Sequence, residues 1–171
     1  KFRMAPMSAA LARTQLQHLC KRNKRRNDNC IYLSEKLLEL GIEPFLAPQN
    51  VSRVYFEFLV RYDAQTTGLK ISDLTTALQA EGALVTAPRY PLLHQQPVFT
   101  SGTWSKIARL PATKEGPLHI YDPADLPATT LGNGTLLKLP AFPSATTELL
   151  DQYAEAFTKV LSHAAEIPRA N

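Results

Sequence analysis

Three side chains that can bind a polar or anionic ligand lie close together between residues 88 and 97. Arg89 offers a planar set of N–H donors, Tyr90 carries a hydroxyl on a rigid ring, and His94 can donate or accept near neutral pH. The prolines of this segment restrict its backbone, which lowers the entropy lost when a ligand binds. The segment therefore predicts a ligand site. The alternative is that Tyr90 and His94 only satisfy nearby backbone groups.

Other arrangements that perform chemistry are missing from the sequence. The four histidines have neither HxxxH nor HExxH spacing, and the two cysteines stand ten residues apart, so no metal site is expected. There is no glycine-rich phosphate loop and no GxSxG nucleophile motif. A basic run over residues 21–26 supplies much of the net charge of +4. That run indicates either a solvated helix face or a surface for nucleic acid or another polyanion.

The composition is that of a globular protein, with 44% hydrophobic and 20% charged residues. No apolar run approaches the roughly 20 residues that span a bilayer, and no secretory leader is seen before the first helix. We therefore expect a cytoplasmic protein that does not enter a membrane.

Hydrophobic periodicity predicts the elements that must position these side chains. A long helix should end before Gly41, and a terminal helix should be capped by Thr146 or Thr147. The segment between residues 88 and 134 is expected to be irregular because it is rich in proline. The expected helices are 6–40, 72–82 and 145–165, and the expected strands are 51–62, 83–86 and 135–139. This order predicts a small α/β (α+β) fold with a three-stranded sheet flanked by helices, preceded by a long helix.

Three blocks of sequence, taken in order, resemble one known family. They are the opening Lys1–Met4 with its following helix of small residues, the segment Pro88–Phe99, and Leu137–Pro143 before the last helix. Together they resemble the DegT/DnrJ/StrS family of PLP-dependent sugar aminotransferases. The resemblance implies the small C-terminal domain of a fold type I PLP enzyme. It divides the chain into an interdomain helix over residues 1–40 and the small domain over residues 41–171, with the large PLP-binding domain upstream.

The resemblance also assigns roles to individual residues. Lys1 would reach across a homodimer toward the cofactor phosphate, and Arg3 follows the same cofactor-binding pattern. Arg89, Tyr90 and His94 would line the substrate pocket. The lysine that forms the Schiff base belongs to the large domain, so no catalytic residue is assigned in this chain, and the chain alone is expected to be inactive.

The resulting hypothesis is a fragment of an aminotransferase that acts on a keto-sugar or keto-cyclitol with glutamine or glutamate as amino donor. Pyridoxal phosphate and the homodimer would belong to the longer parent protein. Three alternatives stay open from the sequence. One is a sugar dehydratase of the same family, in which histidine replaces the Schiff-base lysine; the others are a non-catalytic relative and a basic polyanion-binding module.

Overall fold

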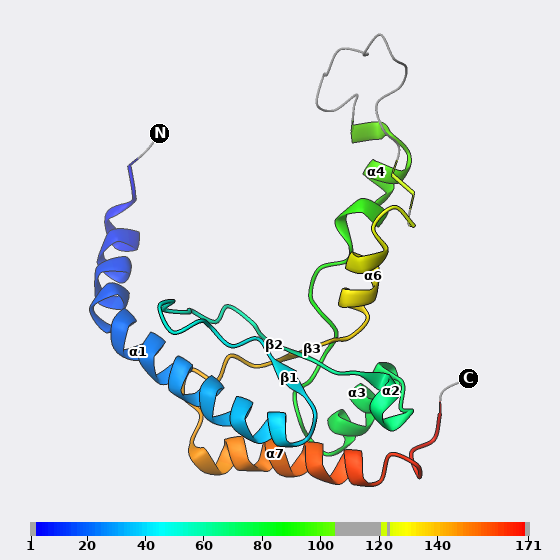
Figure 1. Ribbon diagram of the computed structural model, residues 1–171. Helices are drawn as coiled ribbons and strands as arrows, with labels where there is room; N and C mark the ends of the chain where they lie inside the picture. The colour runs from blue at the N-terminus through cyan, green and yellow to red at the C-terminus, as the bar shows by residue number, and fades with distance from the viewer. Residues whose placement is uncertain (1–2, 105–120, 123, 170–171) are drawn as a thin grey trace.

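A computed structural model describes residues 3–104, 121–122 and 124–169 of the chain. The longer helices and a small sheet build the body of the fold, and shorter helices lie in the connections (Figure 1). The elements are α1 (Pro6–Glu39), β1 (Glu43–Pro44), β2 (Phe58–Arg61), α2 (Ala64–Thr67), α3 (Ile71–Ala80), the 3₁₀ helix η1 (Leu93–Gln95), α4 (Pro97–Thr100), α6 (Pro127–Asn133), β3 (Leu136–Leu139) and α7 (Thr147–Ser162).

The sheet is antiparallel, with the strand order β1-β2-β3. The expected strand 51–62 is only partly confirmed, because its ladder is limited to β2. Its partner β1 ends at Pro44, and β3 is followed by Pro140; proline has no N–H to donate to a ladder. The expected strand 83–86 is reduced to one bridge, in which Thr86 and Lys138 exchange backbone hydrogen bonds of 3.0 and 2.8 Å.

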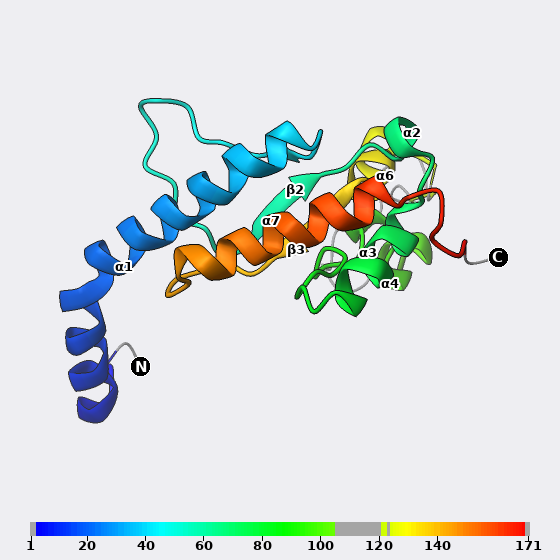
Figure 2. The same cartoon turned by 90° about the horizontal axis from the view of Figure 1, so that it is seen from below.

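The hydrophobic core lies between the sheet and two helices that pack side by side, α1 and α7 (Figures 1 and 2). The sheet contributes Phe58, Val60, Leu137 and Leu139, α1 contributes Cys30, Leu33 and Leu37, and α7 contributes Leu150, Tyr153, Phe157 and Val160. The mixed α/β fold with a three-stranded sheet and flanking helices is therefore confirmed. The expected cap of the last helix is also present, since the Thr146 hydroxyl accepts a hydrogen bond from the Leu149 N–H.

Helix α1 is continuous from Pro6 to Glu39, as predicted. Gly41 ends it with φ +76°, a conformation that glycine adopts without strain, and the Ile42 N–H then bonds back to the Leu37 carbonyl at 3.0 Å. The N-terminal half of α1 bends and projects away from the sheet (Figure 2). In that half, the Thr14 hydroxyl donates to the Ala10 carbonyl at 3.1 Å, a bond that commonly bends helices.

On the other side of the body, α4 and α6 rise from the sheet as an arm (Figure 1). The sequence predicted this segment to be irregular, and α6 is therefore a correction. Its first residue, Pro127, stands where the missing N–H costs nothing, at the first position of a helix. The element is short, at seven residues, which explains why periodicity did not show it.

Candidate functional site

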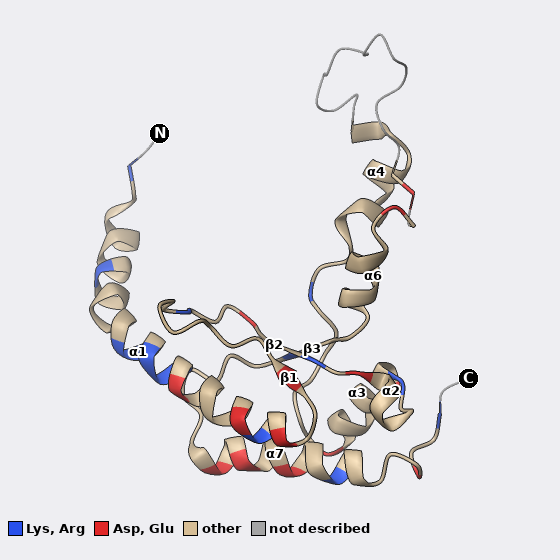
Figure 3. Cartoon of the chain, viewed as in Figure 1, with Lys and Arg blue, Asp and Glu red and all other residues tan. Residues whose placement is uncertain are grey.

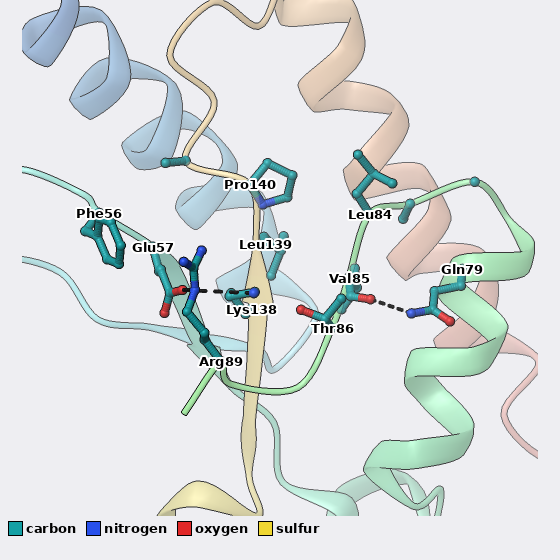
Figure 4. A pocket seen from close by; sticks show the side chains of 13 residues that line it. Phe56, Glu57, Gln79, Leu84, Val85, Thr86, Arg89, Lys138, Leu139 and Pro140 are labelled. Atoms are coloured by element: carbon teal, nitrogen blue, oxygen red, sulfur yellow. Dashed lines mark hydrogen bonds and ion pairs between the residues drawn. The ribbon is translucent and has the colours of Figure 1, made fainter. Parts of the chain in front are cut away.

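The best-organised polar cluster of the described chain centres on Glu57, the residue immediately before β2. The Arg89 Nε donates to the Glu57 Oε1 at 2.8 Å, and the Arg89 guanidinium lies 5.3 Å from the centre of the Phe56 ring (Figure 4). The Thr86 bridge to β3 holds the chain three residues before Arg89. A carboxylate and an aromatic ring thus fix the guanidinium from two sides.

Lys138 completes this cluster from the middle of β3. Its Nζ lies 4.0 Å from the same Glu57 oxygen. The Glu57 side chain is only 14% exposed and that of Lys138 23% exposed, so both are partly shielded from water. Partial burial strengthens interactions between charges relative to the open surface. One carboxylate therefore stands between two cations, and the cluster carries a net positive charge.

These three side chains line a pocket of about 650 Å³ (Figure 4). Two hydrogen bonds hold the opposite wall. The Gln79 Nε2 donates to the Val85 carbonyl at 2.7 Å, and the Leu84 N–H donates to the Tyr153 hydroxyl at 3.0 Å. The rest of the lining is mainly apolar and includes Leu84, Val85, Leu139, Pro140 and Ala141. The pocket thus combines a charged side with an apolar wall, as small-molecule sites usually do.

Tyr90 lies at a neighbouring pocket of about 560 Å³, which Arg89 also lines. Its side chain is 66% exposed. Ser72, Thr75 and Asn133 add further polar groups to this second pocket. Arg89 is therefore shared between two adjacent pockets, and Tyr90 belongs to one of them.

His94 is placed differently from Arg89 and Tyr90. It lies in η1, is only 5% exposed, and lines neither of the two pockets. The structure therefore brings together two of the three side chains expected to contact substrate and buries the third in the arm. A substrate role for these residues stays a prediction.

The two residues expected at the cofactor are near the free end of α1. Arg3 precedes the helix and is exposed. Lys1 lies outside the described residues. The bend in α1 carries this end well away from the sheet and from the Glu57 cluster (Figure 1).

Several of the described lysines pair with carboxylates. The pairs are Lys24 with Asp28, Lys36 with Asp151, Lys138 with Glu57 and Lys159 with Glu81. Hydrogen bonds to Asp151 and Tyr32 raise the pKa of Lys36, whereas a lysine that attacks an aldehyde must be neutral. The absence of a Schiff-base lysine from this chain stays a prediction.

Basic residues gather in the middle of α1 (Figure 3), and several of them contact other residues of the chain. Lys24 forms an ion pair with Asp28 at 2.7 Å, and the Arg25 Nη2 donates to the carbonyls of Ser144 and Ala145 at 3.3 Å. Arg26 donates to the Asn23 side chain at 3.4 Å. Of these three, only Lys24 meets an acidic partner, whereas Arg25 and Arg26 bond to neutral oxygens and keep their positive charge. Both interpretations of the run therefore stay open.

Within the described ranges, no three side chains that could hold a metal ion come together. The helices there include none with the length and apolar character needed to cross a membrane.

Sequence reasoning missed both Glu57 and Lys138. Alternation along residues 54–61 places Glu57 on the strand face opposite Phe58, which is buried. Lys138 is the one charged residue of the apolar segment 136–139. Each was a visible signal, but the sequence did not indicate that these residues meet Arg89.

Comparisons with known proteins agree on one family. The family described as DegT/DnrJ/EryC1/StrS aminotransferase matches residues 1–158. An L-glutamine:2-deoxy-scyllo-inosose aminotransferase of Streptomyces kanamyceticus is 31% identical over 171 residues, which covers 95% of this chain and 38% of that protein. An L-glutamine:scyllo-inosose aminotransferase of Streptomyces griseus is 28% identical, covering 97% of this chain and 39% of the relative.

The fold has the same relatives. A structure described as a sugar aminotransferase from Streptococcus pneumoniae, in its PMP form, superposes with a TM-score of 0.70 at 16% identity. The match covers 93% of this chain and 35% of that one. This chain thus spans less than two fifths of the length of the proteins it resembles. Since the family match extends over most of its residues, the chain belongs to the DegT/DnrJ/EryC1/StrS aminotransferase family.

Proposed function

We propose that this chain is the C-terminal, substrate-facing part of a PLP-dependent aminotransferase that transfers an amino group to a keto-cyclitol or keto-sugar. The observation that carries this proposal is the family match, which two curated cyclitol aminotransferases with L-glutamine in their names support. In this proposal residues 1–40 form the interdomain helix and residues 41–171 the small domain. The parent protein is a cytoplasmic homodimer.

The residues of this chain would bind and orient substrate. Arg89 offers donors to substrate oxygens, and the exposed Tyr90 hydroxyl offers a further polar contact in the adjacent pocket. A cyclitol carries several hydroxyls, so a pocket with hydroxyl, amide and guanidinium groups suits it chemically. Pyridoxal phosphate, when bound, supplies the electron sink for amino transfer.

Lys1 and Arg3 would contribute from the far end of α1. The family resemblance assigns Lys1 to the cofactor phosphate of the neighbouring subunit, and Arg3 follows the same cofactor-binding pattern. Arg3 is exposed, and α1 projects away from the sheet, which is compatible with contact to another protein body (Figure 1). Both side chains are cationic and would favour a phosphate by charge.

The sugar dehydratase alternative differs in the residue at the Schiff-base position, which this proposal places outside the chain. The polyanion-binding alternative rests on the basic run of α1, in which Lys24 alone of the two residues Lys24 and Arg25 pairs with a carboxylate. It predicts an affinity for DNA or RNA that falls steeply with salt, because phosphate contacts release counterions. A fluorescence anisotropy titration at two salt concentrations distinguishes it.

The proposal is tested on the complete polypeptide that contains this segment and, in parallel, on the 171-residue chain. The complete protein should show the absorbance of bound PLP and convert 2-deoxy-scyllo-inosose to its amine with L-glutamine. The 171-residue chain should do neither. Bound PLP with turnover by the 171-residue chain, or no amination of any cyclitol or sugar ketone by the complete protein, would contradict the proposal.

Variants of the complete protein test the assigned contacts. Tyr90→Phe removes one hydrogen bond and should raise the KM for the keto substrate about 3- to 10-fold. Tyr32→Phe is a matched control, because it removes the same hydroxyl from a residue that bonds to Asp151 outside both pockets. Equal effects of the two substitutions would show that Tyr90 has no particular role in substrate binding.

A further inference from the structure

Arg89 and Lys138 come from two segments that the backbone holds side by side. Lys138 lies in β3, and its backbone exchanges hydrogen bonds with Thr86, three residues before Arg89. The Arg89 Nε and the Lys138 Nζ lie 2.8 and 4.0 Å from the same oxygen, Oε1 of Glu57. The two cationic nitrogens are therefore closer to each other than the Debye length of about 8 Å at physiological salt, and they repel each other.

Glu57 is the group that offsets this repulsion. Its side chain is only 14% exposed, whereas that of Arg89 is 52% exposed. The next residue, Phe58, is fully buried and pairs with Leu139 of β3, so the backbone that carries the carboxylate is fixed. The Arg89 side chain is long and loses many rotamers when it is held in one place. Its conformation therefore depends on the carboxylate of Glu57.

The contact with Glu57 leaves most of the guanidinium available. Only the Arg89 Nε donates to Glu57, and neither Nη group hydrogen-bonds to a residue of the described chain. The Phe56 ring lies 5.3 Å from the guanidinium but is itself 73% exposed, and a cation–π contact at an exposed ring is weak. Glu57 is thus the stronger of the two holds, and it leaves the four N–H groups of the Nη atoms for a ligand.

We propose that Glu57 is a positioning residue for Arg89. Its carboxylate holds the guanidinium through Nε, offsets the charge of Lys138, and so presents the Nη groups to the oxygens of the keto substrate. Glu57 itself makes no contact with substrate. The inference rests on the proposed function, in which Arg89 binds the keto substrate. It adds that without the carboxylate the ammonium of Lys138 pushes the guanidinium out of place.

Crystal structures of the complete protein test the positioning without any need for activity. In the unmodified protein Arg89 should lie on Glu57 and Phe56. Glu57→Ala should displace the guanidinium from the Phe56 ring. Glu43→Ala is the matched control, because it removes a carboxylate that pairs with Arg61 outside both pockets, and it should leave Arg89 in place. An Arg89 side chain that keeps its position in Glu57→Ala would overturn the proposal.

Steady-state kinetics of the complete protein test the effect on substrate. Glu57→Ala should raise the KM for 2-deoxy-scyllo-inosose about 10-fold, the usual effect of losing a charged hydrogen-bond partner. Glu57→Gln keeps an acceptor oxygen without the charge and should raise this KM less. Glu43→Ala should leave it unchanged. Equal KM values for Glu57→Ala and the unmodified protein would contradict the role of Glu57.

Two double variants distinguish positioning from a merely structural role. Adding Lys138→Met to Glu57→Ala removes the repelling cation and should recover part of the lost affinity for the keto substrate, whereas a structural role predicts a further loss. In an Arg89→Met protein, Glu57→Ala should have little further effect, because Glu57 acts through Arg89. Additive losses in both double variants would show that Glu57 does not act through Arg89.

These outcomes separate the inference from the proposed function. Amination with an unaltered KM for the keto-cyclitol in Glu57→Ala would overturn the role of Glu57 alone. No amination by the unmodified protein would overturn the proposed function, and the crystal structures would then still decide whether Glu57 positions Arg89.

Discussion

Replacing Leu37 by alanine tests how α1 packs on the rest of the fold. The Leu37 side chain is fully buried, whereas the next residue, Leu38, is 47% exposed. Burial of this kind makes Leu→Ala cost about 2–5 kcal/mol, through lost transfer free energy and the cavity left behind. At about 3 kcal/mol, and with 2–4 °C per kcal/mol for a domain of this size, Leu37→Ala should lower the Tm by about 6–12 °C.

Leu38→Ala is the matched control, with the same chemical change on the same helix. It should alter the free energy of unfolding by about 0.5 kcal/mol or less, as is usual for exposed sites. Urea unfolding followed by circular dichroism at 222 nm measures both variants, and the urea m-value should stay unchanged. Equal destabilisation by the two substitutions, or a larger effect of Leu38→Ala, would refute the orientation of α1 described here.

Three further predictions concern the surface, the charges and the thiols. The N-terminal half of α1 exposes apolar side chains, among them Leu11, Leu16 and Leu19. The 171-residue chain should therefore self-associate in sedimentation velocity, and the double substitution Leu11→Gln/Leu16→Gln should reduce this association. A monomer at high concentration would contradict the prediction. The hydrogen bond from Tyr32 and the contact with Lys36 hold the pKa of the Asp151 carboxyl below 3.8. The stabilisation that these contacts give is therefore complete at neutral pH and is lost as the pH falls below 3.8. Tyr32→Phe should make the urea midpoint of unfolding fall less steeply as the pH is lowered, and an unchanged slope would count against this network. Burial raises the pKa of the Cys30 thiol to about 12, whereas Cys20 is exposed. A thiol reagent at about pH 8 should therefore modify one cysteine in the native chain and two in denaturant. Cys20→Ser should remove the reaction of the native chain.

Local patterns in the sequence predicted the long helices well. The spacing of Cys30, Leu33 and Leu37 gives α1 its buried face, and the apolar stripe of α7 does the same for the last helix. Gly41 and Thr146 mark a helix end and a helix start through backbone chemistry that acts within a few residues. These features need no information about distant parts of the chain.

The extent of the sheet could not be predicted in the same way. Alternation holds from Phe58 to Arg61 but not before, since Tyr55 is buried and Phe56 is exposed. A ladder also needs partners, and the partners of β2 end near Pro44 and Pro140. The pairing of Thr86 with Lys138 is likewise a long-range contact. Strand length therefore depends on neighbours that a single segment does not reveal.

The candidate site shows the same division. Arg89 and Tyr90 were identified by type and spacing, and the fold places both at adjacent pockets. Glu57 and Lys138 meet Arg89 only because β2, β3 and the loop after Thr86 converge; Glu57 and Arg89 are 32 positions apart in the chain. His94 has suitable chemistry but is buried in the arm, since packing and not residue type decides exposure.

The packing of α1 against α7 has a consequence for synthesis on the ribosome. These two helices are the first and last elements of the described chain, and about 110 residues separate them. At translation rates of about 5–20 residues per second, the apolar face of α1 is synthesised roughly 5–20 seconds before α7, which packs against it. During that time Leu33 and Leu37, which are fully buried in the folded chain, lack the contacts that α7 later provides.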